Sequence, residues 1–118
     1  MNDKPHLDEE ALAELRDVME DEFPVLIETY INDSRERISA LEDAIEAGDA
    51  EECRKTAHSF KGSCINIGAP RLGSICFLAE QAAREARVED CAAYLSQIEE
   101  EFHTVRELFR DRFGAGAP

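Results

Sequence analysis

The chain has 118 residues, 43% of them hydrophobic, and its 13 basic and 27 acidic side chains give a formal net charge of −14. The length suits one domain with a single core, and the acidic excess repels nucleic-acid phosphates and anionic lipid. No apolar run approaches the roughly 18 residues of a membrane span, and the first ten residues lack the basic character of a signal peptide. We therefore expect a cytoplasmic protein that binds neither nucleic acid nor membranes.

The first predicted helix is short and covers residues 8–22. Asp8 is a suitable N-cap, and the apolar residues of this segment share one side of the helix. They are Leu12, Leu15, Val18 and Met19. We expect this helix to lie over the rest of the domain as a lid.

The second and third helices have clear starts and ends. Pro24 suits the first turn of the second helix, which ends at Gly48. Asp49 and Glu52 have the spacing of a capping box for the third helix, which ends at Gly68. Apolar residues recur in alternating steps of three and four, the pattern of helices packed nearly antiparallel to their neighbours. The positions of this stripe are Ile27, Ile31, Ser34, Ile38, Leu41 and Ile45 in the second helix, where Ser34 is the polar member, and Cys53, Ala57, Phe60, Cys64 and Ile67 in the third.

Two further helices complete the chain. Pro70 opens the fourth, and Glu89 and Asp90 lie at the start of the fifth. Their inward positions are Leu72, Ile75, Cys76, Ala79, Ala82 and Ala86, and then Cys91, Leu95, Ile98, Phe102, Val105 and Phe109. Short connections make sequential helices antiparallel.

We therefore predict one all-α domain over residues 1–118. It consists of the lid helix at 8–22, an up-down-up-down four-helix bundle at 24–112 and a tail at 113–118. Five helices can cover one another's apolar faces, so we expect a monomer.

The four cysteines show no short paired spacing, so neither a zinc site nor a redox dithiol is predicted. We expect reduced thiols in the core.

One histidine is predicted to face solvent. With about 100° of rotation per residue, His58 lies roughly 140° from the centre of the apolar side of the third helix. Arg54, Lys55 and Lys61 lie within roughly 60° of it on the same helical wheel. His58 is thus surrounded by positive charge.

Acidic residues are absent from the segment around this histidine. None of the 27 lies between Cys53 and Ala79, where an even distribution would place about six, whereas Arg71 and the three basic residues named above do lie there. Such a basic patch in an acidic chain indicates recognition of a phosphate or of an acidic pocket on a partner.

Gly62 lies one turn after His58, in the middle of the predicted third helix. A glycine there costs about 1 kcal/mol relative to alanine, so it needs a compensating reason. One reason is functional: the missing side chain leaves room for another protein's active site to close over the imidazole. The other is structural: a neighbouring helix crosses close to this point.

The segment from Ala57 to Ser63, with sequence AHSFKGS, and the later Ile67-Gly68-Ala69 resemble the signature of histidine-containing phosphotransfer domains. The match includes the histidine, the lysine three residues later and the glycine four residues later, and the five-helix pattern extends it over almost the whole chain. The resemblance implies a four-helix bundle whose exposed histidine is phosphorylated by the phospho-aspartate of a receiver domain.

It also implies that His58 passes the phosphoryl group to another receiver, so that the partners are hybrid sensor histidine kinases and response regulators. The chain is similar to a free-standing carrier with no ATP-dependent kinase activity of its own. Lys61 would steady the phosphoryl charge. The receiver of such a pair supplies the magnesium ion, so no metal or other cofactor is expected on this chain.

Other residues are candidates for contacts around His58. Gln81, on the fourth helix, is a candidate neighbour of the imidazole or phosphoryl group, since some relatives have a polar residue near that place. The candidates for docking a receiver are Arg54, Lys55, Ser59, Ile65, Arg71, Leu15 and Met19. The apolar ones among them are equally consistent with packing between lid and bundle.

Two rival functions remain. The first is a helical adaptor that docks receivers without phosphotransfer, against which His58 and Lys61 argue. The second is a metal or haem bundle, which would need facing ligands inside the core, whereas the three histidines are scattered and His58 is predicted to point outward.

Overall fold

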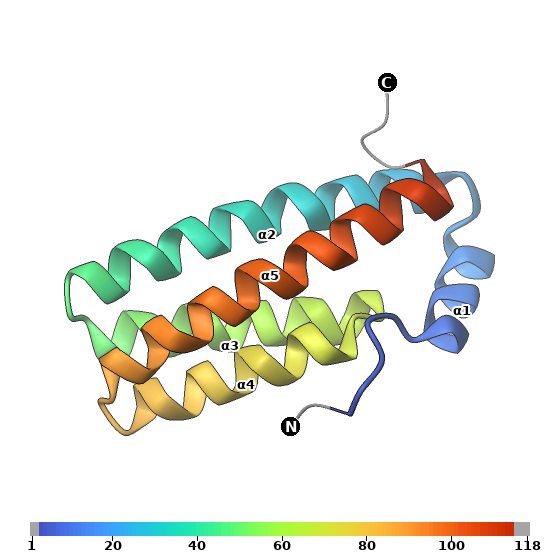
Figure 1. Ribbon diagram of the computed structural model, residues 1–118. Coiled ribbons are helices and arrows are strands. Elements are labelled where there is room, and N and C mark those ends of the chain that lie inside the picture. Colours follow the sequence, from blue (N-terminus) through green and yellow to red (C-terminus); the bar gives the residue numbers. More distant parts are fainter. Residues whose placement is uncertain (1–2, 115–118) are drawn as a thin grey trace.

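The computed structural model describes residues 3–114, and over this range the chain is helical with short connections (Figure 1). In chain order the elements are α1 (Glu9–Met19), a 3₁₀ turn (Glu20–Glu22), α2 (Phe23–Glu46), α3 (Ala50–Ile67), α4 (Pro70–Arg84) and α5 (Val88–Phe113). The predicted all-α fold is confirmed. Each of these helices is too short or too polar to cross a membrane.

The helix ends follow from the capping residues. The Asp8 carboxylate accepts a hydrogen bond from the Ala11 backbone N–H at 3.1 Å, and the Asp49 carboxylate accepts one from the Glu52 N–H at 3.0 Å. At the other end of α3, Gly68 adopts φ = 90°, a left-handed conformation that is costly for residues with a Cβ. These contacts fix where α3 starts and stops.

The long helices α2, α3, α4 and α5 run alternately up and down, and each packs against two neighbours (Figure 1). Their shared core includes all four cysteines, which are free and buried. Burial raises the pKa of the Cys53 thiol to about 11, which keeps that thiol protonated and unreactive near neutral pH. The largest fully buried side chains are Phe60, Phe109, Ile27, Ile31, Leu41, Leu72, Ile98 and Val105.

Helix α1 crosses one end of the bundle, as Figure 1 shows, and packs against α2 and α3. Leu12 is buried there, but Val18 is 79% exposed, so its predicted place on the apolar side is wrong. The reason is the helical wheel, on which Val18 lies about 120° from Leu12. Separately, α1 stops at Met19: Glu20 adopts φ = 47°, and the chain makes a 3₁₀ turn where a continuous helix to residue 22 was expected.

Helices α4 and α5 also differ from expectation at their ends. Helix α4 stops at Arg84, and Ala86 is exposed with φ = 60°, so it is not an inward residue. Helix α5 continues to Phe113, whose ring packs edge-on against Phe23 with centroids 5.0 Å apart. Residues 115–118 of the expected tail lie outside the described residues.

The segment before α1 is attached to the bundle. The Asp8 backbone N–H donates to the Gly68 carbonyl at 2.8 Å, and Leu7 is buried. The guanidinium of Arg71 donates to the Lys4 carbonyl at 2.7 Å, while the His6 imidazole lies 2.7 Å from the carboxylate of Glu101. These bonds hold the N-terminal segment across the turn between α3 and α4.

Candidate functional site

His58 lies on the outer face of α3, as its position on the helical wheel predicts. Its side chain is 61% exposed, while Ala57, Phe60 and Cys64 of the same helix are completely buried. The apolar side of α3 thus anchors the helix in the core, and this leaves the imidazole at the surface.

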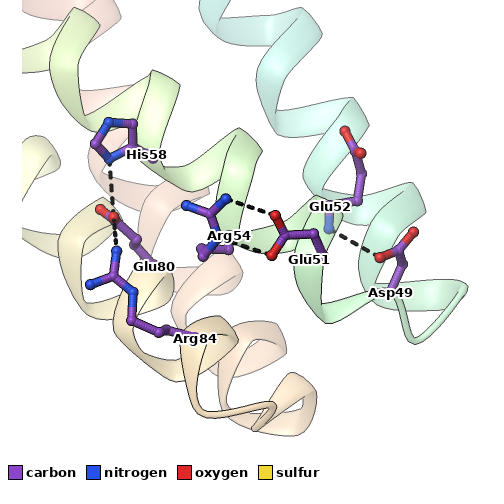
Figure 2. Close-up of polar contacts among 7 residues, drawn as sticks. All are labelled: Asp49, Glu51, Glu52, Arg54, His58, Glu80 and Arg84. Atoms are coloured by element: carbon purple, nitrogen blue, oxygen red, sulfur yellow. Dashed lines mark hydrogen bonds and ion pairs between the residues drawn. The ribbon is translucent and has the colours of Figure 1, made fainter.

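A buried carboxylate lies next to this imidazole. Glu80 of α4 is only 2% exposed, and its Oε2 lies 3.0 Å from His58 Nδ1 (Figure 2). Lys61 Nζ lies 2.9 Å from the other carboxylate oxygen, Oε1, and Arg84 Nη2 donates to Oε2 at 2.9 Å. One buried acid therefore joins three basic side chains from two helices.

The protonation state of Glu80 follows from these contacts. Burial alone would raise the pKa of its carboxyl group, but the hydrogen bonds and charges of Lys61 and His58 outweigh burial and leave the pKa below its ordinary value of 4.5. Glu80 is therefore an ionised acceptor near neutral pH. Because a carboxylate cannot donate, His58 Nδ1 carries the shared proton as the donor.

The consequence for His58 is a fixed tautomer. In a neutral imidazole with its proton on Nδ1, the lone pair lies on Nε2. Nδ1 faces the buried carboxylate, so Nε2 is the nitrogen left to face solvent (Figure 2). The arrangement presents one nucleophilic nitrogen, in one orientation, to an incoming molecule.

The residue of α4 that is bonded to His58 is Glu80 and not Gln81, the candidate from the sequence. Gln81 is exposed one position later, about 100° further around the helix. Glu80 is the first acid after the acid-free segment, and an acid is not expected on the inward side of a helix. A signal was present, since Glu80 lies next to Ala79 on the buried side of α4, and a buried acid requires partners.

Gly62 borders the imidazole and leaves an open space. A Cβ added there would meet nothing within 4 Å, whereas a Cβ added at Gly73 of α4 would lie 3.1 Å from Cγ1 of Ile65 on α3. Close helix packing thus accounts for Gly73 but not for Gly62. The structural explanation for Gly62 is therefore unsupported, and the functional one stays a prediction.

A groove runs beside His58 between α1, α2 and α3, with a volume of about 600 Å³. Helix α1 contributes apolar side chains to one wall, α2 contributes both apolar and polar side chains to it, and α3 forms the other wall. Of the residues singled out from the sequence, it brings together Leu15, Met19, His58, Ser59 and Gly62.

The remaining candidates for docking a receiver lie outside this groove. Arg54 forms an ion pair with Glu51 on its own helix, and Arg71 is engaged with the N-terminal segment. Lys55 is exposed and lines a hollow adjoining the groove. Ile65 is exposed two turns after His58, where α3 meets α4.

The contacts of Glu80 predict how its replacement affects stability. Glu80→Gln should lower the free energy of unfolding at pH 7 by about 1–3 kcal/mol, because charge-assisted hydrogen bonds to Lys61 and Arg84 are lost. Since the pKa of Glu80 is depressed in the folded state, its contribution is fully present above pH 4.5 and is lost as the pH falls through the folded-state pKa. The two proteins should therefore converge in acid.

Urea denaturation of wild type and variant between pH 7 and pH 3 measures this difference. Glu99→Gln, which removes an exposed acid of α5, is the matched control and should show little difference at any pH. A Glu80→Gln difference that stays constant down to pH 3 would contradict the assigned charge state.

Comparisons with known proteins agree with this geometry. The family model of the Hpt domain matches residues 25–108. Histidine-containing phosphotransfer protein 4 of Arabidopsis thaliana is 29% identical over 116 residues, covering 93% of this chain and 91% of that protein. Pseudo histidine-containing phosphotransfer protein 1 of Oryza sativa subsp. japonica is 25% identical, covering 93% of this chain and 62% of that protein.

A solved structure is similar over the same extent. The crystal structure of histidine-containing phosphotransfer protein B from Pseudomonas aeruginosa PAO1 superposes with a TM-score of 0.89 at 48% sequence identity, covering 91% of this chain and 93% of that one. The family match includes α3, α4 and the intervening turn, and thus His58 with its buried acid. The chain belongs to the Hpt domain family of histidine phosphotransfer proteins.

Proposed function

We propose that His58 accepts a phosphoryl group from the phospho-aspartate of a hybrid sensor kinase's receiver domain and passes it to the receiver domain of a response regulator. The observation that carries this proposal is the exposed imidazole whose Nδ1 is bonded to buried Glu80. Because Nδ1 is occupied by this bond, Nε2 is the nitrogen that can act as the nucleophile. Phosphotransfer through histidine is the chemistry of the family to which the chain belongs.

The transfer step is a displacement at phosphorus. The Nε2 lone pair forms the new N–P bond as the bond between phosphorus and the aspartate oxygen breaks, and the aspartate leaves as a carboxylate. The Nδ1 proton stays between His58 and Glu80, so no proton has to leave during the transfer. The reverse sequence, on a second receiver, releases the phosphoryl group from His58.

This chemistry needs positioning and positive charge more than covalent assistance. Glu80 is a positioning residue because its carboxylate is bonded to Nδ1 and so fixes the orientation of the imidazole ring. Lys61 is bonded to Glu80 in the unphosphorylated protein, and its charge remains within one turn of the imidazole, where it offsets phosphoryl charge. The proposal assigns the magnesium ion to the receiver, and this chain acts as a carrier without ATP-dependent kinase activity.

The rival function is a receiver-binding adaptor without phosphotransfer, and the similar rice protein is named a pseudo histidine-containing phosphotransfer protein. Similarity alone therefore does not assign the carrier role. An adaptor needs neither an outward imidazole nor a buried carboxylate that fixes its tautomer, and burying Glu80 is costly without its partners. The Glu80 cluster favours the carrier.

We further propose that the protein works in the cytoplasm as a monomer. Free, buried cysteines suit a reducing compartment. The four long helices cover one another's apolar sides, which removes the need for a second copy.

Replacing the nucleophile is the direct test. His58→Gln should abolish phosphorylation by phosphoramidate and by a phosphorylated receiver domain, and its melting temperature should stay close to that of wild type because the side chain is mostly exposed. Intact-mass spectrometry should detect one acid-labile phosphoryl group on wild type and none on the variant. His103→Gln, which removes an exposed histidine of α5, is the control and should be phosphorylated like wild type. An unmodified wild type with several competent donors would favour the adaptor.

Filling the space at Gly62 tests the need for access. Gly62→Gln should raise the free energy of unfolding by up to about 1 kcal/mol, because glutamine favours a helix and its Cβ meets no neighbour, while slowing transfer from a receiver at least several-fold. Denaturant melts and the rate of phosphohistidine formation measure the two effects. Transfer at the wild-type rate would remove the functional explanation of this glycine.

A further inference from the structure

Arg37 of α2 reaches the helix that carries His58. Its Nε donates to the Ser59 hydroxyl at 3.1 Å, and Ser59 directly follows His58 on α3. The guanidinium has five N–H groups, and this bond uses one of them. Arg37 is half-buried and lines the groove, and the bond to Ser59 anchors its guanidinium there.

Three other basic groups near His58 are already paired, while Lys55 lines the adjoining hollow. Lys61 and Arg84 share the carboxylate of Glu80, and Arg54 pairs with Glu51. Among residues 3–114, by contrast, Arg37 has no carboxylate partner within ion-pair distance, although Asp33 lies one turn earlier and lines the same groove. Its Nη donors remain available to an external anion.

Arg37 has two candidate anions, a phosphoryl group on His58 and a carboxylate on a partner protein, and its position favours the second. The His58 imidazole is bonded to α4 through Glu80, whereas Arg37 approaches α3 from α2 on the opposite flank. Its bond to Ser59 keeps the guanidinium on that flank. A phosphoryl group on Nε2 is therefore less accessible to Arg37 than a protein surface that enters the groove beside His58, Leu15 and Met19.

We propose that Arg37 is a specificity-determining contact for the receiver domain: its Nη groups bind a carboxylate on the receiver surface that fills the groove, and they do not hold the phosphoryl group. An Arg–carboxylate contact of this kind is directional because the guanidinium fork matches two carboxylate oxygens. At the rim of an interface it acts mainly on the association rate and weakens with salt. The inference rests on the proposed role of His58 as phosphoryl acceptor.

The test compares two phosphoryl donors on Arg37→Ala. One donor is a purified receiver domain, phosphorylated with acetyl phosphate and magnesium and selected because it transfers to wild type. The other is phosphoramidate, which is too small to occupy the groove. We expect the second-order rate with the receiver to fall about five- to tenfold at low ionic strength, and the ratio of receiver-driven to phosphoramidate-driven rates to fall by the same factor. This defect should shrink at about 0.5 M salt, where exposed charges are screened.

Arg35→Ala is the matched control, because Arg35 is an exposed arginine two residues earlier on the same helix and lines neither groove nor hollow. Arg37→Lys keeps the charge but loses the fork, so it should recover only part of the receiver-driven rate. This variant also replaces Arg37→Ala if the latter melts at a lower temperature than wild type.

Two outcomes would overturn the inference. Equal loss with both donors would show that Arg37 acts on His58 or its phosphoryl group, and a receiver-driven rate equal to that of Arg35→Ala would show that Arg37 makes no contact of consequence. Failure of the proposed function itself is distinct, since no receiver domain that transfers to wild type would then be found and phosphoramidate would leave His58 unmodified.

Discussion

The buried carboxylate of Glu80 is the group on which the geometry of the site depends. A carboxylate that is 2% exposed has lost most of its water, and without compensation this loss costs several kcal/mol. Lys61 and Arg84 supply the compensating charges, and His58 Nδ1 supplies a further hydrogen bond. Because two cations already balance one anion, His58 Nδ1 needs to supply only a hydrogen bond. The contact that satisfies the carboxylate thus also fixes the tautomer that a nucleophilic imidazole requires.

The fold places these groups through the packing of α3 against α4. Gly73 lies two turns before Glu80, and its missing side chain lets α4 approach Ile65 and the backbone of Lys61 on α3. Asp49 fixes the first turn of α3, and Gly68 fixes its last. The register between the two helices brings an acid of one beneath a histidine of the other.

The sequence was sufficient for features that depend on one helix at a time. Capping residues located the ends of α3, and helical periodicity placed Ala57 and Phe60 inside and His58 outside. It was insufficient for features that depend on two helices, because the axial offset between neighbours is not contained in the periodicity of either. The imidazole is bonded to Glu80, one residue before the predicted Gln81, and neither this bond nor the one between Arg37 and Ser59 follows from the periodicity of a single helix. Ala86 was misplaced because the chain leaves helical geometry there, where no glycine marks the break. Val18 was misplaced because it lies about 120° from Leu12 around a regular helix.

The central claim is that Glu80 holds the Nδ1 proton of His58 and thereby presents Nε2 to the phosphoryl donor. The most direct measurement is a long-range ¹H–¹⁵N correlation spectrum of the histidine side chains, recorded before and after phosphorylation. The account predicts that the proton of His58 resides on Nδ1 in the unmodified protein and that coupling to ³¹P appears on Nε2 after transfer. A proton on Nε2 in the unmodified protein, or phosphorus on Nδ1, would contradict it.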